Sequence, residues 1–331
     1  MMQMLRPYGK LGDRMNDKEL EFEKRILEFE NKLAELKEIA SSFNTDLSPE
    51  IRAIEKQLLK EKKLLYSKLT PWQKVLISNN SQRPRSSDYI NTLMKDRVEL
   101  FGDRIFGDDP AIIVGLANFK GYKVVFLGQE KGRDTKERIA KNFGYMHPEG
   151  YRKALRLMRL AEKFNKPIVS FIDTPGADPG VSSELRGQHV AIGENIGIMS
   201  VLKVPIISVV IGEGGSGGAL GVGVSDKILM LENAIYMVCK PETCSEILRW
   251  GSERVPEAAS ALKLTADDLK ELGIIDEVIA EPLGGAHRDP GLTINRVGRA
   301  LKKNLDELTP LNKDELLERR YQKYRQIGAV A

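Results

Sequence analysis

The sequence is poor in the residues from which metal centres and disulfide frameworks are built. Its 331 residues include two cysteines and three histidines. The cysteines, Cys239 and Cys244, form a C-x4-C pair with no histidine nearby, which supplies too few ligands for a structural zinc site. We therefore expect no metal in this chain and assign the cysteines to the core or to a strand end.

Long apolar runs are also missing. No segment approaches the ~18 consecutive apolar residues that a membrane-spanning helix needs, and the N-terminal stretch MMQMLRPYGKLGDR has no apolar signal core. Together with the scarcity of cysteine, this predicts a cytoplasmic protein that does not bind membranes. The net charge of +4 permits attraction to anionic ligands, but it is too small to predict nucleic-acid binding as the main role.

Residues 1–80 are dominated by a helical pattern, and we assign them to an N-terminal arm. From Asp17 to Ala40 the apolar residues alternate at spacings of four and three, which is a heptad seam. A second helix is expected from Ser48, a suitable N-cap followed by Pro49, and a short third one after Thr70. The pattern predicts a helical hairpin that serves assembly or packing.

Residues 81–331 alternate strands with helices, which predicts an α/β domain. The expected elements are hairpin strands at 111–119 and 122–130, a helix at 148–165, a strand at 167–173, a helix at 184–202, a strand at 204–211, short strands at 227–231 and 235–239, and an exposed, charged helix at 312–326. A right-handed crossover should place strands 168–173 and 205–211 in parallel as near neighbours. The glycine-containing loops that follow them would then meet at one edge of the sheet, where α/β proteins bind ligands.

The second of these loops, GEGGSGG at residues 212–218, contains five glycines in seven residues. It follows a β-branched strand that we expect to end at Ile211, and a small, apolar helix is expected to start between Ala219 and Val224. Such a turn brings bare backbone N–H groups close to a ligand. The loop fits three motifs, each with a different chemistry.

A dinucleotide-binding G-x-G-x-x-G is disfavoured, because the nine residues between Gly217 and the strand at Lys227 leave too little room for a crossover helix. The second motif, G-x-S-x-G, would make Ser216 a hydrolase nucleophile, with His287 as base and Asp226 or Asp276 as acid. Since the serine is flanked by glycines, its hydroxyl looks incidental. The third hypothesis, an oxyanion hole of backbone N–H groups, uses every glycine and is favoured; an assembly scaffold is the non-enzymatic alternative.

Several long motifs in fixed order carry a family resemblance over essentially the whole chain. They are EKGRDTKERIAKNFG (130–144), PEGYRKALRLMRLAEKF (148–164), FIDTPGADPG (171–180), VPIISVVIGEGGSGGAL (204–220) and EPLGGAHR (281–288). The chain closely resembles the alpha subunits of the carboxyltransferase component of acetyl-coenzyme A carboxylase. The resemblance implies a crotonase-like (ClpP/crotonase) spiral fold and transfer of a carboxyl group from carboxybiotin to acetyl-coenzyme A, giving malonyl-coenzyme A for fatty acid synthesis.

The resemblance also implies partners and cofactors. It implies a beta subunit that carries the zinc, in an assembly of two alpha and two beta subunits. It further implies a carrier protein that presents biotin, and a biotin carboxylase as the ATP-binding component. No cofactor would be bound covalently to this chain.

Carried over by motif, the site consists of backbone. The N–H groups of Gly218 and Ala219, with Gly217 beside them, would stabilise charge on the biotin ureido oxygen. The rest of the carboxybiotin pocket implied by the resemblance is Gly214, Gly215, Ser216, Gly176, Ala177 and Asp178.

The chain departs from the usual family pattern at three places. Asp178 stands where tyrosine is more common, residues 182–185 replace a segment richer in glycine and glutamate, and Gly221-Val222 replaces Ala-Ile. These departures affect the shape of the pocket wall. The basic segment 131–141 and the arginine face of the helix around Arg152 are expected either to meet a carrier domain or phosphate, or to form a plain solvated face.

Overall fold

The computed structural model describes residues 21–43 and 45–328, and the contacts divide the chain into two compact units, Met1–Leu69 and Thr70–Ala331. The first unit is a helical hairpin of α2 (Lys24–Phe43) and α3 (Ser48–Tyr66), preceded by the short turn η1 (Glu21–Glu23). Ion pairs Lys37–Glu55 and Lys62–Glu30 show that the two helices run antiparallel. The expected hairpin is confirmed, and its first residues, 17–20, lie outside the described part of the chain. The domain boundary at 80/81 stays a prediction.

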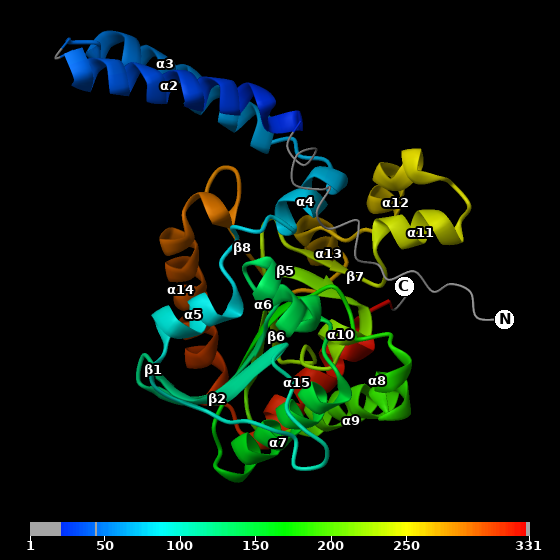
Figure 1. Cartoon of the computed structure of the whole chain (residues 1–331). Coiled ribbons are helices and arrows are strands. Elements are labelled where there is room, and N and C mark those ends of the chain that lie inside the picture. The colour runs from blue at the N-terminus through cyan, green and yellow to red at the C-terminus, as the bar shows by residue number, and fades with distance from the viewer. Residues whose placement is uncertain (1–20, 44, 329–331) are drawn as a thin grey trace. The chain divides into compact units, whose positions relative to one another are not determined.

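The second unit is built on one mixed sheet with the order β1-β2-β3-β4-β5-β6-β8 (Figure 1). Pairing is antiparallel from β1 to β3 and parallel from β3 onwards. The expected hairpin and the parallel pair of central strands are therefore confirmed. The strands are β1 (Lys95–Glu99), β2 (Ile112–Phe119), β3 (Tyr122–Gln129), β4 (Ile168–Thr174), β5 (Ile206–Gly215), β6 (Lys227–Leu231), β7 (Ile235–Met237) and β8 (Glu277–Ile279).

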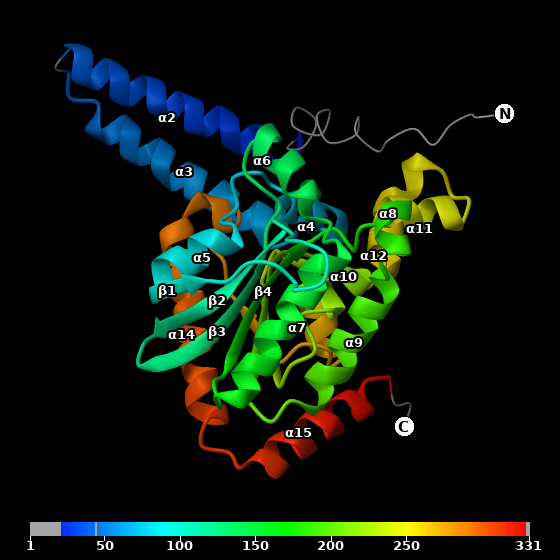
Figure 2. The ribbon, with the colours of Figure 1, turned by 60° about the horizontal axis from the view of Figure 1, so that its bottom comes forward.

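Helices cover both faces of this sheet. Helix α7 buries Ala154, Leu157, Met158 and Ala161, the apolar face predicted from the sequence, and packs on β2 and β3 beside α9. Helices α5 and α14 pack on the other face (Figure 2). The helices of this unit are α4 (Pro71–Ser78), α5 (Ser86–Leu93), α6 (Thr135–Ala140), η2 (Asn142–Gly144), α7 (Pro148–Lys163), α8 (Val181–Leu185), α9 (Gln188–Val201), α10 (Ser216–Leu220), α11 (Pro241–Ile247), η3 (Ser252–Arg254), α12 (Val255–Ala261), α13 (Ala266–Glu271), η4 (Ala286–Arg288), α14 (Pro290–Leu308) and α15 (Lys313–Gln326).

The glycine stretch differs from expectation in one important way. The strand does not end at Ile211 but continues to Gly215, because β5 pairs with β6 through its first part and with β7 at residues 213–215. The helix that follows starts at Ser216 rather than Ala219 and ends at Leu220. Most of the glycines therefore belong to a buried strand, and the turn is confined to a single step at Ser216.

The helix expected at 184–202 is also wrong in detail. It is two helices, α8 and α9, separated by Gly187, whose φ of 80° lies in the left-handed region. Strands β1 and β8 were not predicted, because β1 is exposed at all five residues and β8 has only three. Neither shows the apolar alternation that marks a strand in a sequence.

Helix α15 was expected to be exposed, but it is anchored to the sheet by a buried arginine. Arg320 is 1% exposed and donates to both carboxylate oxygens of Asp226, at 2.8 Å each. Its remaining N–H groups donate to three backbone carbonyls, that of residue 199 in the last turn of α9 and those of residues 202 and 204 in the link to β5. This arginine fixes the amino end of β5, opposite the glycine turn.

Among the described helices, none is long and apolar enough to cross a membrane.

Candidate functional site

The loops that follow β4 and β5 touch each other through glycine. A Cβ atom on Gly218 would lie 2.4 Å from the carbonyl carbon of Gly176 and 2.6 Å from the nitrogen of Ala177. A Cβ atom on Gly215 would lie 2.2 Å from the Pro175 oxygen. Real Cβ atoms do not approach so closely, so any side chain at these two positions would force the loops apart. The structure thus brings together the two glycine loops that the sequence pattern placed at one sheet edge.

The turn after β5 contains a row of backbone N–H groups that have no partner within its helix. Ser216 has a φ of 47°, a left-handed conformation that turns the chain sharply from β5 into α10. Gly217, Gly218 and Ala219 lie in the first turn of this helix, where N–H groups have no partner within the helix. Gly218 and Ala219 are buried while Gly217 is half-buried. Such donors can stabilise negative charge that develops on an oxygen atom of a substrate.

The geometry gives no support to a catalytic triad at Ser216. Asp226 is engaged by Arg320, and Asp276 accepts from Lys323 and from the N–H of Ile228. His287 is half-buried, and burial, together with the charges of Arg288 and Arg83, lowers its pKa to about 4. Among the described residues no hydrogen bond joins Ser216 to a histidine, and the serine itself is exposed. The expectation that its hydroxyl is incidental stays a prediction.

The loop after β4 is held by the unusual Asp178. Its carboxylate accepts from Asn142 Nδ2 at 3.0 Å and from the Gly180 N–H at 3.2 Å, and His147 Nδ1 lies 3.5 Å away. Although burial opposes ionisation, hydrogen bonds from Ser183 and Asn142 and the charge of His147 lower the pKa of Asp178. This carboxylate therefore ties the loop to its neighbours. The third departure, at Gly221, is explained by packing, since a Cβ atom there would lie 2.6 Å from the ring of Tyr151.

The loop after β4 and the turn after β5 differ in how their backbone N–H groups are engaged. The Gly176 N–H is directed at Thr174 Oγ1 at 3.2 Å, and the Asp178 N–H donates to the Met146 carbonyl at 3.0 Å. The Ala177 nitrogen lies against Gly218 instead. Two backbone N–H groups of the loop after β4 are thus engaged within the chain, whereas those in the first turn of α10 have no partner within their helix.

A buried ion cluster lies beneath this turn, and the sequence analysis missed it. Lys131 Nζ contacts Asp173 Oδ1 at 2.8 Å and Glu213 Oε2 at 2.7 Å, and Arg85 contacts Asp173 Oδ2 at 3.2 Å. Burial alone would raise the pKa of Asp173, but Lys131 and Arg85 outweigh it and lower that pKa. The cluster joins the ends of β3, β4 and β5. The sequence does contain a signal for this cluster, because Asp173 and Glu213 are single charged residues that follow or interrupt buried strands.

Part of each basic feature predicted from the sequence is engaged within the chain, while residues 133–136 and Arg159 are exposed. Lys131 is buried in the ion cluster, and Lys141 pairs with Glu130 at 3.1 Å. On α7, Arg152 contacts Asp103 at 2.8 Å and Glu149 at 3.0 Å. These side chains are largely committed to ion pairs within the chain.

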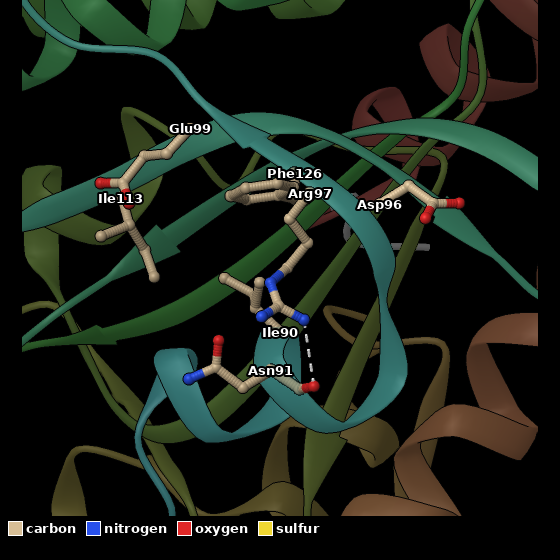
Figure 3. A pocket seen from close by; sticks show the side chains of 7 residues that line it. All are labelled: Ile90, Asn91, Asp96, Arg97, Glu99, Ile113 and Phe126. Atoms are coloured by element: carbon tan, nitrogen blue, oxygen red, sulfur yellow. Dashed lines mark hydrogen bonds between the residues drawn. The ribbon is translucent and has the colours of Figure 1, made fainter.

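A hollow of about 330 Å³ lies elsewhere, between α5 and the first strands of the sheet (Figure 3). Ile90, Ile113 and Phe126 line it with Arg97, which donates to the carbonyls of Asn91 and Met94 at the end of α5. None of the predicted site residues lines this hollow. Within residues 21–43 and 45–328, no group of three or more His, Cys, Asp or Glu side chains could hold a metal ion.

Comparison with known proteins gives a consistent family. Residues 19–328 match the model of the family described as acetyl co-enzyme A carboxylase carboxyltransferase-like. The chain is 51% identical over 312 residues to the acetyl-coenzyme A carboxylase carboxyl transferase subunit alpha of Thermus thermophilus, covering 94% of this chain and 99% of the relative. It is 50% identical to the subunit of the same name from Bacillus cereus strain G9842, covering 95% and 97%.

Solved structures with this fold are more distant in sequence. A transcarboxylase 12S structure with methylmalonyl-coenzyme A and methylmalonic acid bound superposes with a TM-score of 0.57 at 18% identity, covering 71% of this chain and 44% of that one. A Pseudomonas malonate decarboxylase hetero-tetramer in complex with coenzyme A gives 0.55 at 17% identity, covering 67% and 88%. These likenesses confirm the predicted crotonase-like fold.

Proposed function

Because this chain belongs to the family of acetyl-coenzyme A carboxylase carboxyltransferase alpha subunits, and is therefore part of a biotin-dependent enzyme that makes malonyl-coenzyme A, we propose that its glycine turn is the part that acts on carboxybiotin. The observation that carries this proposal is the backbone contact of Gly218 with Gly176 and Ala177 at the ends of β4 and β5. We place the site where these two loops meet, with the donors of the turn after β5 on one side and the loop after β4 on the other.

In this proposal the N–H groups of Gly218 and Ala219 donate to the ureido oxygen of carboxybiotin. As the bond between the ureido nitrogen and the carboxyl carbon breaks, the electron pair stays on the ureido group, and its negative charge is stabilised by these donors. The ureido group then takes a proton from the acetyl methyl, and the resulting carbanion bonds to the released carboxyl carbon. One donor of this kind typically contributes ~10²- to 10³-fold in rate.

The other predicted residues shape the pocket. Gly217 borders the donors, while Gly214, Gly215 and Ser216 form the approach from β5. Gly176, Ala177 and Asp178 form the opposite wall, with the carboxylate of Asp178 holding that loop in place.

A subunit of this enzyme needs partners, and the family supports specific ones. We infer a beta subunit that binds acetyl-coenzyme A and carries the zinc, in an assembly of two alpha and two beta subunits. The carrier protein would present biotin at the glycine turn, biotin carboxylase would recharge it, and the complex would work in the cytoplasm.

The test is reconstituted transfer from carboxybiotin to acetyl-coenzyme A, with the beta subunit added or omitted. Malonyl-coenzyme A should form only when both subunits are present, and full activity of this chain alone would contradict a shared site. Gly218→Val should abolish transfer while size-exclusion chromatography still shows assembly with the beta subunit. Unimpaired transfer by that variant would remove the oxyanion assignment, and loss of all activity in Ser216→Ala would favour a serine hydrolase.

A further inference from the structure

Gln129 connects three parts of the site through one side chain. It is the last residue of β3 and is fully buried. Its Oε1 accepts from the Asp173 N–H at the end of β4, at 3.2 Å. Its Nε2 donates to the carbonyl oxygen of Gly218 at 2.8 Å and also lies 3.2 Å from the sulfur of Met146. The amide therefore links the end of β4 to the glycine turn.

The bond to Gly218 sets the direction of a neighbouring N–H group. In a trans peptide the C=O and the following N–H point in opposite directions in one plane. The Gly218 carbonyl points into the core, where Gln129 and, at 3.4 Å, the hydroxyl of Tyr151 donate to it. The N–H of Ala219, in the same peptide unit, then points to the side opposite Gln129 and Tyr151.

This geometry leads to a role for a residue that does not touch substrate. We propose that Gln129 is a positioning residue for carboxyl transfer, which holds the Gly218–Ala219 peptide so that the Ala219 N–H faces the ureido oxygen. The inference rests on the oxyanion role proposed above. Donation to the peptide oxygen also polarises the unit, so that its N–H becomes a stronger donor.

The chemistry of the position is demanding. Because Oε1 is taken by a backbone N–H, the amide nitrogen must be the end that faces Gly218. Among side chains with the shape of glutamine, an amide or a neutral carboxylic acid can accept at one end and donate at the other. Methionine fills the same volume but donates nothing.

The experiment uses the complete complex with the beta subunit and the biotinylated carrier. In Gln129→Met the buried Gly218 carbonyl loses its main donor, which we expect to lower kcat roughly tenfold. The KM for acetyl-coenzyme A should stay within about twofold, because that substrate does not contact the reoriented peptide. The matched control is Asn195→Leu, which removes another fully buried amide that bonds to the Tyr151 and Gly221 carbonyls but not to Gly218. It should cost stability and leave kcat of the assembled enzyme unchanged.

The variant Gln129→Glu allows a measurement, the pH dependence of kcat relative to wild type, that would not change if Gln129 only filled space. When neutral, the new carboxyl can accept from Asp173 N–H and donate to the Gly218 oxygen, so kcat relative to wild type should rise as the pH falls from about 8 to about 6, where a buried carboxyl gains its proton. The ionisable side chains around this position are Asp173, Lys131, Glu213 and Tyr151, and they are common to both proteins, so their titration largely cancels in the ratio. Gln129→Met should show a flat ratio.

Three outcomes would overturn the inference: wild-type kcat in Gln129→Met, equal losses in Gln129→Met and Asn195→Leu, or a flat pH ratio in Gln129→Glu. The parent proposal fails separately. If Gly218→Val transfers at the wild-type rate, the oxyanion assignment itself is wrong. If Gly218→Val is inactive and Gln129→Met is not impaired, only the positioning role is lost.

Discussion

The two ends of the central strands both contain buried charges but use them differently. At the amino end of β5, the guanidinium of Arg320 meets one carboxylate and three backbone carbonyls between the last turn of α9 and the start of β5. At the carboxyl end, the charges of Lys131, Arg85, Asp173 and Glu213 are shared among four segments. At the carboxyl end, Gly215 and Gly218 pack against the backbone of the loop after β4 with no room for a methyl group. The amino end anchors helix α15, and the carboxyl end sets the spacing between the two loops of the candidate site.

This comparison predicts that changes at the carboxyl end reduce the transfer rate, while changes at the amino end reduce stability. Gly215→Ala should have the largest effect on rate. Its Cβ atom would lie 2.2 Å from the Pro175 oxygen, so the two loops must separate, and a displacement of about 1 Å can cost ~10²-fold in rate. The carboxyl-transfer assay measures it. Gly107→Ala, which adds the same methyl where no atom lies within 4 Å, is the control and should match wild type.

Lys131→Met should come next. It leaves Asp173 and Glu213 buried without their shared cation, which costs about 3–5 kcal/mol of unfolding free energy. Because the cluster joins the ends of β3, β4 and β5, the folded fraction should also lose roughly tenfold in kcat. Urea unfolding and the transfer assay measure the two effects. A stability loss without any rate loss would show that this cluster is only an anchor, like Arg320.

Arg320→Met should cost a similar 3–5 kcal/mol, since it leaves Asp226 buried and unpaired. Its effect on kcat per assembled complex should be less than twofold, because the glycine turn lies at the other end of β5. Thermal unfolding and the transfer assay at a temperature where the variant is folded separate the two. A tenfold loss of kcat would contradict the division between the ends.

His287 should give the smallest effect, one that appears only in acid. Burial holds its folded-state pKa at about 4, below the roughly 6.5 of an unfolded chain. Between these values the unfolded state binds the proton and the folded state does not, so this group makes wild type lose stability as the pH falls from 6.5 towards 4. His287→Leu should lose less over that window in urea unfolding, with an unchanged transfer rate at pH 8. Parallel pH profiles of the unfolding free energy for wild type and His287→Leu would contradict this prediction.

The sequence predicts which loops meet at the candidate site better than it predicts the buried polar residues that hold those loops. Two β-branched strands joined by a crossover place the loops after Asp173 and Ile211 together, and the structure has them in contact. The end of β5 could not be predicted, because glycines 214 and 215 are extended only through their pairing with β7. Gln129, Lys131 and Arg320 were missed for the same reason. Their backbone and carboxylate partners lie between 42 and 121 residues away, and a linear pattern does not show which distant carbonyl or carboxylate a buried polar residue will meet.

The backbone nature of the glycine turn limits how its chemistry can be dissected. An alanine scan removes side chains, and at positions 215 and 218 it adds one instead, so the scan tests space rather than hydrogen bonding. Replacing the Gly218–Ala219 amide by an ester through semisynthesis would remove the Ala219 N–H and keep the Gly218 carbonyl for Gln129. Under the proposed mechanism the group to delete is a main-chain N–H, which the genetic code can remove only by inserting proline.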